Sequence, residues 1–449
     1  LLNLLKKYIL LFIILLFCSK IKGQSGFYFS GDKKNKQSIR FKLINNLIVI
    51  PLEINGKPLS FILDTGVNKT ILFNLSKKDS LDLRNARRII LRGLGSGAPV
   101  EALVSKGNQF KIKNLISEKE ELCVILEDKF DISAKMGVTI HGIIGYSLFK
   151  NLIVNINYRT KKIAFYNPNT FDYPKCKRCE VFSLEFYKNK PYINTEIQLD
   201  TIENKKIAVK MLIDTGGSDA LWLFEGSKKE IKTPKKYFND FIGEGLSGTI
   251  YGHRARIPIA KLGSYEIKAP TVTFLDSIST FNARKFKERN GSFGGGALKR
   301  FKIWIDYPNK KITFKKNGSL SKGFFYNMSG LGIVYNGQEL VQEEVKDQII
   351  QMANGGSRNK GSFSFVTSYR YNFKPSYKVE RVIKGSPGDL SGIKEGDEIK
   401  MINGRFSYEY NTLEEIISLF RTKPNKRIRM VVNRNGLKLK FEFRLRRRI

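Results

Sequence analysis

Short apolar runs, interrupted by glycine, asparagine or pairs of lysine, recur along most of the chain. One such run, Leu47–Ile54, is followed by Asn55-Gly56 and then by a second apolar run, Leu59–Leu63. Asn-Gly between two apolar runs is a strong signal of a two-residue β-hairpin turn. The same layout returns later, where runs at Tyr192–Leu199 and Ile207–Ile213 are joined by a polar turn. The pattern predicts a mainly β protein that contains two hairpins of the same design.

Both hairpins end in the same tripeptide. Asp64-Thr65-Gly66 follows the first hairpin and Asp214-Thr215-Gly216 follows the second, so the two aspartates lie 150 positions apart. A carboxylate at the end of an apolar strand is costly, because burial disfavours its charged form. Its occurrence twice in the same context indicates that the two aspartates act together.

Other segments recur at nearly the same offset. A glycine-rich turn at residues 93–97 is matched by one at residues 243–248, and His141–Tyr158 is matched by Asn290–Tyr307. An offset that stays nearly constant over so many elements indicates an internal duplication rather than chance.

The duplicated elements resemble the aspartic peptidases of the pepsin and retropepsin type. Besides Asp-Thr-Gly and the glycine turn, the family pattern has two apolar residues followed by glycine, and each copy carries a match near its end. These are Ile143-Ile144-Gly145 and, less regularly, Ser292-Phe293-Gly294. The resemblance implies a bilobal fold of two duplicated β lobes, which we place at residues 24–170 and 171–319.

The resemblance also implies a role for each motif residue. Asp64 and Asp214 would be the catalytic pair of an aspartic endopeptidase that cleaves polypeptides. The supporting residues would be Thr65, Gly66, Thr215 and Gly216, with the two threonine hydroxyls interlocking between the lobes. The glycine turns would be mobile flaps, the alternative being ordinary hairpin turns, and their glycines are Gly93, Gly95, Gly97, Gly243, Gly245 and Gly248.

Paired carboxylates are sufficient for this chemistry. Two carboxylates in contact cannot both ionise cheaply, so they share one proton, and one activates water while the other protonates the leaving group. We expect no metal and no cofactor, since the chain has two histidines and no His-Glu-x-x-His motif. Val67 and Gly217 follow the two motifs where pepsin-like enzymes carry a hydroxyl, which predicts raised pKa values and activity at weakly acidic to neutral pH.

The second glycine turn also fits another motif. Gly243-x-Gly245-x-x-Gly248 matches the dinucleotide-binding fingerprint, which requires a helix to open at the glycines. The following segment is strand-like and contains Pro258. We therefore reject a dinucleotide site.

The C-terminal part resembles a PDZ domain, which we place at residues 320–449. Ser329–Ile333 resembles the carboxylate-binding loop, and a Ser386-Pro387 turn, a Gly-Asp-x-Ile strand and a helix at Thr412–Phe420 follow in order. The resemblance implies an α+β module in which the amides of Leu331, Gly332 and Ile333 receive a peptide C-terminus. The longer stretch inside it is predicted to form a helix at Glu339–Ala353 and then a loop. The module would deliver substrate, tether the enzyme or regulate it.

Residues 1–23 have the layout of a signal peptide, with two lysines before an apolar run too short to span a membrane. We expect cleavage, export to the periplasm or the medium, and no retained membrane span. The closest resemblance is to exported bacterial aspartyl proteases that carry a PDZ domain. Cys176-Lys-Arg-Cys179 is compatible with a local disulfide, and we assign it no chemistry.

The formal net charge of +38 is spread along the chain without a nucleic-acid motif, so it predicts a basic solvated surface and no nucleic-acid partner. We expect a monomer. The alternative to an endopeptidase is an exported module that binds polypeptide at both the peptidase-like and PDZ parts without cleaving it.

Overall fold

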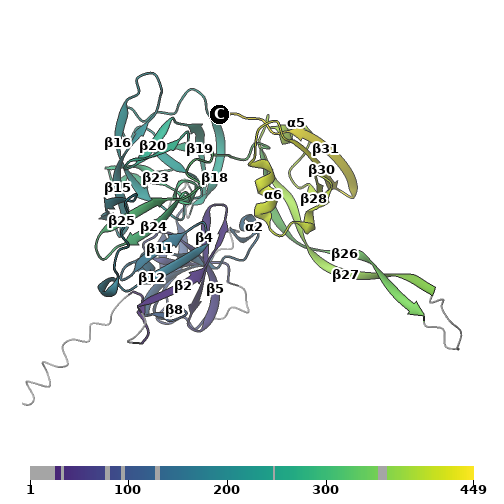
Figure 1. Ribbon diagram of the computed structural model, residues 1–449, viewed down its shortest axis with the longest axis horizontal. Helices are drawn as coiled ribbons and strands as arrows, with labels where there is room; N and C mark the ends of the chain where they lie inside the picture. Colours follow the sequence, from purple (N-terminus) through teal and green to yellow (C-terminus); the bar gives the residue numbers. More distant parts are fainter. Residues whose placement is uncertain are drawn as a thin grey trace, which may run out of the picture. The chain divides into compact units, whose positions relative to one another are not determined.

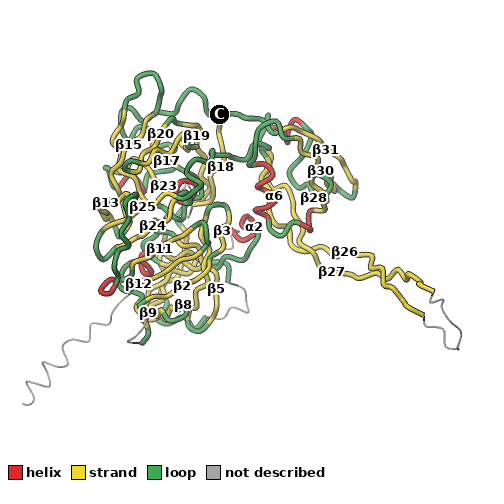
Figure 2. The backbone as a smooth tube through the Cα atoms, in the orientation of Figure 1, coloured by secondary structure: helices red, strands yellow, loops and turns green. Residues whose placement is uncertain are grey.

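The computed structural model describes residues 26–31, 35–75, 81–92, 97–126, 132–245, 248–351 and 362–449. The chain divides into two compact units, one made of Leu1–Phe130, Ile140–Phe324 and Ile449, the other of Asp131–Thr139 and Phe325–Arg448 (Figure 1). Strands dominate both units (Figure 2), as the sequence predicted. The signal-peptide prediction falls on residues outside the described ranges.

The first lobe of the first unit is built on one mixed sheet. Its central strands run β6, β10, β5, β4, and the parallel pair β10 and β5 leads toward Asp64. Within the described residues the sheet has nine strands: β1 (Tyr28–Phe29), β3 (Lys42–Ile44), β4 (Leu47–Ile54), β5 (Lys57–Leu63), β6 (Thr70–Leu72), β7 (Arg87–Leu91), β8 (Val100–Ile112), β9 (Leu115–Ile125) and β10 (Gly142–Ile144). The helix α3 (Tyr146–Phe149) follows β10.

The second lobe repeats this plan. Its central strands run β17, β23, β16, β15, in the same relation as β6, β10, β5, β4. The ten strands found among the described residues are β14 (Glu185–Tyr187), β15 (Lys190–Gln198), β16 (Lys206–Ile213), β17 (Leu221–Phe224), β18 (Phe238–Gly245), β19 (Gly248–Arg256), β20 (Ile259–Leu262), β21 (Tyr265–Lys268), β22 (Thr271–Leu275) and β23 (Arg289–Phe293). Helix α4 (Gly295–Leu298) follows β23, just as α3 follows β10.

A third sheet joins the two lobes. β11 of the first copy pairs antiparallel with β24 of the second, and Asn155 Nδ2 donates to Ile303 O across this pair at 3.1 Å. The sheet's described strands are β2 (Lys36–Arg40), β11 (Ile153–Asn157), β12 (Lys162–Tyr166), β13 (Glu180–Ser183), β24 (Phe301–Asp306) and β25 (Lys311–Lys316). Two short 3₁₀ helices, η1 (Pro168–Thr170) and η2 (Ala283–Lys285), lie in connecting segments. The duplicated, two-lobed β architecture is therefore confirmed.

The two predicted hairpins form as expected. β4 and β5 are joined by Asn55 and Gly56, both of which have positive φ, 48° and 83°, as a two-residue hairpin turn that follows the twist of its strands requires. β15 and β16 form the second hairpin. The last residues of both second strands are buried, Leu63 and Ile213 completely, so burial in the core fixes where each Asp-Thr-Gly begins.

The second unit contains one sheet and two short helices. Its described strands are β26 (Leu331–Gln351), β27 (Ser362–Val382), β28 (Glu398–Ile402), β29 (Arg405–Phe406), β30 (Arg427–Arg434) and β31 (Leu437–Arg444), with α5 (Pro387–Leu390), η3 (Ser407–Glu409) and α6 (Leu413–Phe420). Helix α6 confirms the helix expected at Thr412–Phe420, and Thr412 caps it by accepting from Glu415 N. The segment α2 (Ile132–Met136) also belongs to this unit and packs against β26.

The helix predicted at Glu339–Ala353 is wrong. Residues up to Gln351 belong to β26, which pairs with β27 along almost its whole length, and the remaining residues lie outside the described part. In that register Leu340 faces Phe373 and Gln342 faces Tyr371, so aromatic residues far along the chain pair with this stretch. Cross-strand pairing of this kind overrides local helix propensity, and it cannot be read from the stretch itself.

Cys176 and Cys179 form a disulfide, whereas Cys123 is free and buried in the first lobe. Within the described ranges, no helix is both long and apolar enough to cross a membrane.

Candidate active site

Each Asp-Thr-Gly turn is held by a strand of its own lobe. Asp64 N donates to Ile144 O at 2.8 Å, at the end of the parallel pair formed by β5 and β10. Asp214 N donates to Phe293 O at 2.9 Å in the corresponding place of the second lobe. Ile144 and Phe293, each of which is followed by a glycine, therefore hold the backbone of the two aspartates in place.

The two threonines link the turns across the lobe interface. Each backbone amide donates to the other threonine's hydroxyl, Thr65 N to Thr215 Oγ1 and Thr215 N to Thr65 Oγ1, both at 3.1 Å. Each hydroxyl in turn donates to a carbonyl of the opposite lobe, Thr65 Oγ1 to Ile213 O at 2.6 Å and Thr215 Oγ1 to Leu63 O at 2.8 Å. Both threonines are buried, and the hydrogen bonds that they exchange hold the two turns together.

The glycines allow the carboxyl groups to meet. Gly66 N donates to Asp64 Oδ1 at 2.6 Å, and Gly216 N donates to Asp214 Oδ1 at 3.1 Å. A β-carbon on Gly216 would overlap the Asp64 carboxyl group, and one on Gly66 would lie 3.3 Å from Asp214 Oδ1. The carboxyl groups of Asp64 and Asp214 are hydrogen-bonded to each other.

Burial and proximity change the acidity of the pair. Burial, together with the charge of Asp214, raises the pKa of Asp64 to about 8. Burial also raises the pKa of Asp214, while the nearby cations Arg289 and Lys190 oppose this rise. Because the two groups titrate as a pair, the pair keeps one proton over a wide range around neutral pH.

Sequence analysis did not single out Lys190 or Arg289. Both act electrostatically on the carboxyl pair, and Arg289 is buried. The pairing of Tyr192 with Leu212 brings Lys190 to the end of the hairpin from which Asp214 emerges. The approach of Arg289 depends on β23, which joins the sheet from far along the chain.

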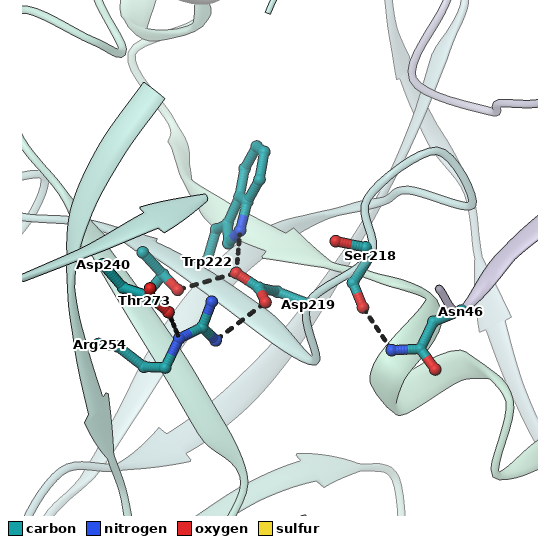
Figure 3. A network of polar contacts seen from close by, with 7 residues as sticks. All are labelled: Asn46, Ser218, Asp219, Trp222, Asp240, Arg254 and Thr273. Carbon is teal, nitrogen blue, oxygen red and sulfur yellow. Dashed lines mark hydrogen bonds and ion pairs between the residues drawn. The ribbon is translucent and has the colours of Figure 1, made fainter. Parts of the chain in front are cut away.

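A second polar network fixes the loop that follows Asp214 (Figure 3). Arg254, on β19, forms ion pairs with Asp219 Oδ1 at 2.9 Å and with Asp240 Oδ2 at 2.5 Å. Asp219 Oδ2 also accepts from Trp222 Nε1 at 2.9 Å and from Thr273 Oγ1 at 2.8 Å. Although burial raises the pKa of Asp219, Arg254 and these donors hold it below its usual value. The network ties the hairpin of β18 and β19 to the loop after Asp214.

The same loop is held from the first lobe. Asn46 Nδ2 donates to Ser218 O at 2.7 Å, and Asn46 Oδ1 accepts from Lys299 Nζ at 2.7 Å. Figure 3 shows Asn46 reaching Ser218 from the side opposite to Arg254.

The structure describes only some of the predicted flap glycines. Gly93 and Gly95 lie outside the described residues. Gly243 and Gly245 end β18, Gly248 begins β19, and a β-carbon built on Gly248 would lie 3.5 Å from Gly97 N. Gly97 and Gly248 therefore approach each other from opposite lobes.

The predicted carboxylate-binding residues begin β26. Leu331 and Ile333 are buried, and Gly332 lies between them in the strand. The Leu331 amide donates to Ser329 Oγ at 3.1 Å, so it already has a partner inside the loop. Gly137, just after α2, lies against Leu413 at the start of α6.

Among the described residues, no group of three or more His, Cys, Asp and Glu side chains is arranged to hold a metal ion.

Two family models match separate parts of the chain. The aspartyl protease family model matches residues 50–148, and the PDZ domain model matches residues 378–434. An aspartic proteinase from Irpex lacteus is a similar solved structure, with 12% sequence identity and a TM-score of 0.44 over 64% of this chain and 99% of that chain. No curated protein sequence matches the chain. The chain thus carries an aspartyl protease domain, matched on its first copy, and a PDZ domain.

Proposed function

We propose that the chain is an aspartic endopeptidase in which Asp64 and Asp214 together activate a water molecule against a peptide bond. One observation carries the proposal. Two duplicated Asp-Thr-Gly turns meet through the exchange of hydrogen bonds between Thr65 and Thr215, and this brings the carboxyl groups of partly buried Asp64 and buried Asp214 into contact. A buried carboxyl pair costs stability, and a catalytic use accounts for that cost.

The pair divides the work through its shared proton. Arg289 acts more strongly on Asp214 than on Asp64, so Asp214 is the carboxyl that ionises first and takes the proton from the attacking water. Asp64 holds the shared proton, donates a hydrogen bond to the developing oxyanion and then protonates the leaving amine. The site residues Thr65, Gly66, Thr215 and Gly216 hold the carboxyl groups in this geometry, and the two glycine turns close over the bound polypeptide as flaps.

Cleavage of an unfolded protein tests the proposal. The full-length chain is incubated with a reduced, unfolded protein substrate from pH 3 to pH 8, and fragments are identified by mass spectrometry. Cleavage at internal peptide bonds supports the proposal, and a single sharp optimum near pH 2 to 3 contradicts the neutral working range that we expect.

Adding a hydroxyl beside Asp214 is expected to keep the enzyme active at lower pH. A β-carbon at Gly217 would lie 3.4 Å from both Cγ and Oδ2 of Asp214, so Gly217→Ser fits and brings a donor to the carboxylate. A donor to the charged form lowers its pKa, and we expect the acid limb of kcat/KM against pH to move down by about one unit. Gly217→Ala is the matched control, because it adds the same β-carbon without the hydroxyl. Equal profiles for the two variants would contradict this explanation.

We further propose that the PDZ domain binds a peptide C-terminus beside β26, with the amides of Gly332 and Ile333, and Leu331 at the loop, nearest to the carboxylate. A fluorescent peptide with a free C-terminal carboxylate is expected to bind saturably to the Asp64→Asn chain, whereas its C-terminal amide should bind at least about tenfold more weakly. Fluorescence polarisation measures both. Equal binding of the two peptides would rule out carboxylate recognition.

Export is also a proposal. It is supported by the signal-like residues 1–23 and by the disulfide between Cys176 and Cys179, since disulfides persist in oxidising compartments. N-terminal sequencing of the protein recovered from its host's exported fraction should begin near Gln24. An uncleaved chain that remains in the cytosol would overturn the proposal.

A further inference from the structure

We propose that Lys190 is a positioning residue of this active site, whose ammonium group stands near both aspartates and keeps the carboxyl pair singly ionised at neutral pH. The inference rests on the proposed function, because it assigns Lys190 a task in the reaction of the pair. It adds a third ionisable group, from outside both Asp-Thr-Gly motifs, to the two aspartates.

The hairpin of β15 and β16 brings Lys190 toward Asp214. In this antiparallel pair, Ile193 faces Met211 and Tyr192 faces Leu212. Lys190 precedes Tyr192 by two residues, and Asp214 follows Leu212 by two residues. Lys190 and Asp214 therefore lie at the same end of the hairpin, just beyond its last β15–β16 pair.

A contact with the first lobe brings the same turn to Asp64. Tyr187 and Lys190 pair at the turn between β14 and β15, and Asn189, inside that turn, donates from Nδ2 to Asn68 Oδ1 at 2.9 Å. Asn68 lies four positions after Asp64. Lys190 thus lies between the two motif turns, and both carboxyl groups act on it electrostatically.

Asp64 and Asp214 are the acidic groups that act most strongly on Lys190. Among the described residues it forms no ion pair. Its side chain is only partly exposed. Burial lowers the pKa of Lys190, and the carboxyl pair opposes that effect. The ammonium and the singly ionised pair therefore stabilise each other.

The remaining charged and titratable groups around the pair have other partners. Arg289 is buried, donates from Nε to Gly291 O at 3.2 Å, lies over the Phe224 ring and hydrogen-bonds Tyr192. Tyr307 is buried near Asp64, and its pKa is raised by burial, so it is neutral. Lys188 is exposed, with its Nζ over the Tyr187 ring. Arg289 has the larger effect on Asp214, and Lys190 is the cation on the turn of the second lobe that contacts the first lobe.

The first copy lacks a cation at the equivalent position. In the pair of β4 and β5, Val49 faces Ile62, and Leu47 lies two residues before Val49 just as Lys190 lies two residues before Tyr192. Lys190 acts on both aspartates, so it favours one negative charge on the pair as a whole. Arg289 acts more strongly on Asp214 than on Asp64, which favours ionisation of Asp214 and leaves the shared proton on Asp64.

The test compares Lys190→Met, Lys190→Arg and Lys188→Met in the full-length chain. Lys190→Met should move the acid limb of kcat/KM up by about one pH unit, which is about a tenfold loss on the acidic side, because the pair then loses one of its two nearby cations. Lys190→Arg should restore the wild-type profile. Lys188→Met removes the same charge two positions away in solvent and should leave the profile unchanged. Identical profiles for the two methionine variants, or no rescue by arginine, would overturn the proposal.

A second readout does not depend on activity. Because the folded pair holds its proton to higher pH than the unfolded chain, folding stability falls between about pH 4 and pH 8. Lys190→Met should enlarge the fall between pH 5 and pH 8 in urea unfolding, and it should not do so when Asp64 and Asp214 are both asparagine. If the wild type cleaves nothing, the proposed function fails while this comparison still decides the role of Lys190. An unchanged fall in the Lys190→Met variant refutes that role.

Discussion

Asp64→Asn and Asp214→Asn are each expected to lower kcat/KM for an unfolded protein substrate by about a thousandfold or more at every pH from 4 to 8. Asparagine can neither take a proton from water nor share one with its partner, so each single variant removes the chemistry of the whole pair. Gly66 N and Gly216 N still have an oxygen to donate to, and the backbone of the turns should remain in place. Asp82→Asn, which neutralises an exposed carboxylate of the first lobe, is the matched control and should retain full activity.

The same variants carry their own check for folding. The pKa of Asp64 is higher in the folded protein, about 8, than in the unfolded chain, so ionisation opposes folding as the pH rises from about 4 to about 8. Asp64→Asn removes that penalty and should stabilise the protein by a few kcal/mol at pH 8 and very little at pH 4. Urea unfolding at the two pH values measures the difference. A stable variant without activity shows lost chemistry rather than lost structure.

Two outcomes would remove the endopeptidase proposal. Equal cleavage by the wild type and both asparagine variants would mean that the products come from another source. A wild type that cleaves nothing across this range, yet binds unfolded polypeptide, would favour the non-catalytic binding module. Only cleavage that both asparagine variants lose supports the paired mechanism.

Arg254→Met is expected to destabilise the first unit by about 3–5 kcal/mol, the largest stability effect of any single change that we predict. Methionine fills much of the same space, but it leaves Asp219 and Asp240 without their shared cation. The Arg254 side chain is only 9% exposed, and its two aspartate partners are 14% and 18% exposed, so water can compensate for little of the lost pairing. Urea unfolding at pH 7 measures the loss.

Two further variants separate the network from simple packing. Arg254→Lys keeps the charge and should lose less than Arg254→Met, because lysine retains one of the two ion pairs. Adding Asp219→Asn and Asp240→Asn to Arg254→Met should recover part of the lost stability, since no unpaired charge then remains buried. A loss below about 1 kcal/mol for Arg254→Met would place the network among weak surface pairs.

Much of the candidate site could be predicted from the chain alone because its determinants are local and repeated. Apolar strands, an Asn-Gly turn and a glycine at each close approach are short-range features, and their duplication placed Asp64 and Asp214 in equivalent positions. The threonine exchange was implied by the resemblance, and the hydrogen bonds between Thr65 and Thr215 have the expected form.

Other features could not be predicted, since they depend on partners far along the chain. Glu339–Gln351 contains good helix-forming residues, yet it forms a strand because it pairs with β27. Arg254 meets Asp219 only because β19 joins β22 and β17 in one sheet. Neither pairing leaves a signal in the local pattern of apolar and polar residues.

The sequence by itself determined a mainly β, duplicated protein with two Asp-Thr-Gly turns and a separate C-terminal module, because burial of alternating apolar residues and the turn chemistry of Asn and Gly act over a few residues. The tertiary structure alone decided how the two turns differ. The pairing of β15 with β16 brought Lys190 toward the aspartates, at the position where the first copy has Leu47, and sheet order brought Arg254 to the loop beyond Asp214. Charge interactions act through space rather than along the chain, so the electrostatics of the pair were settled only when the strands came together.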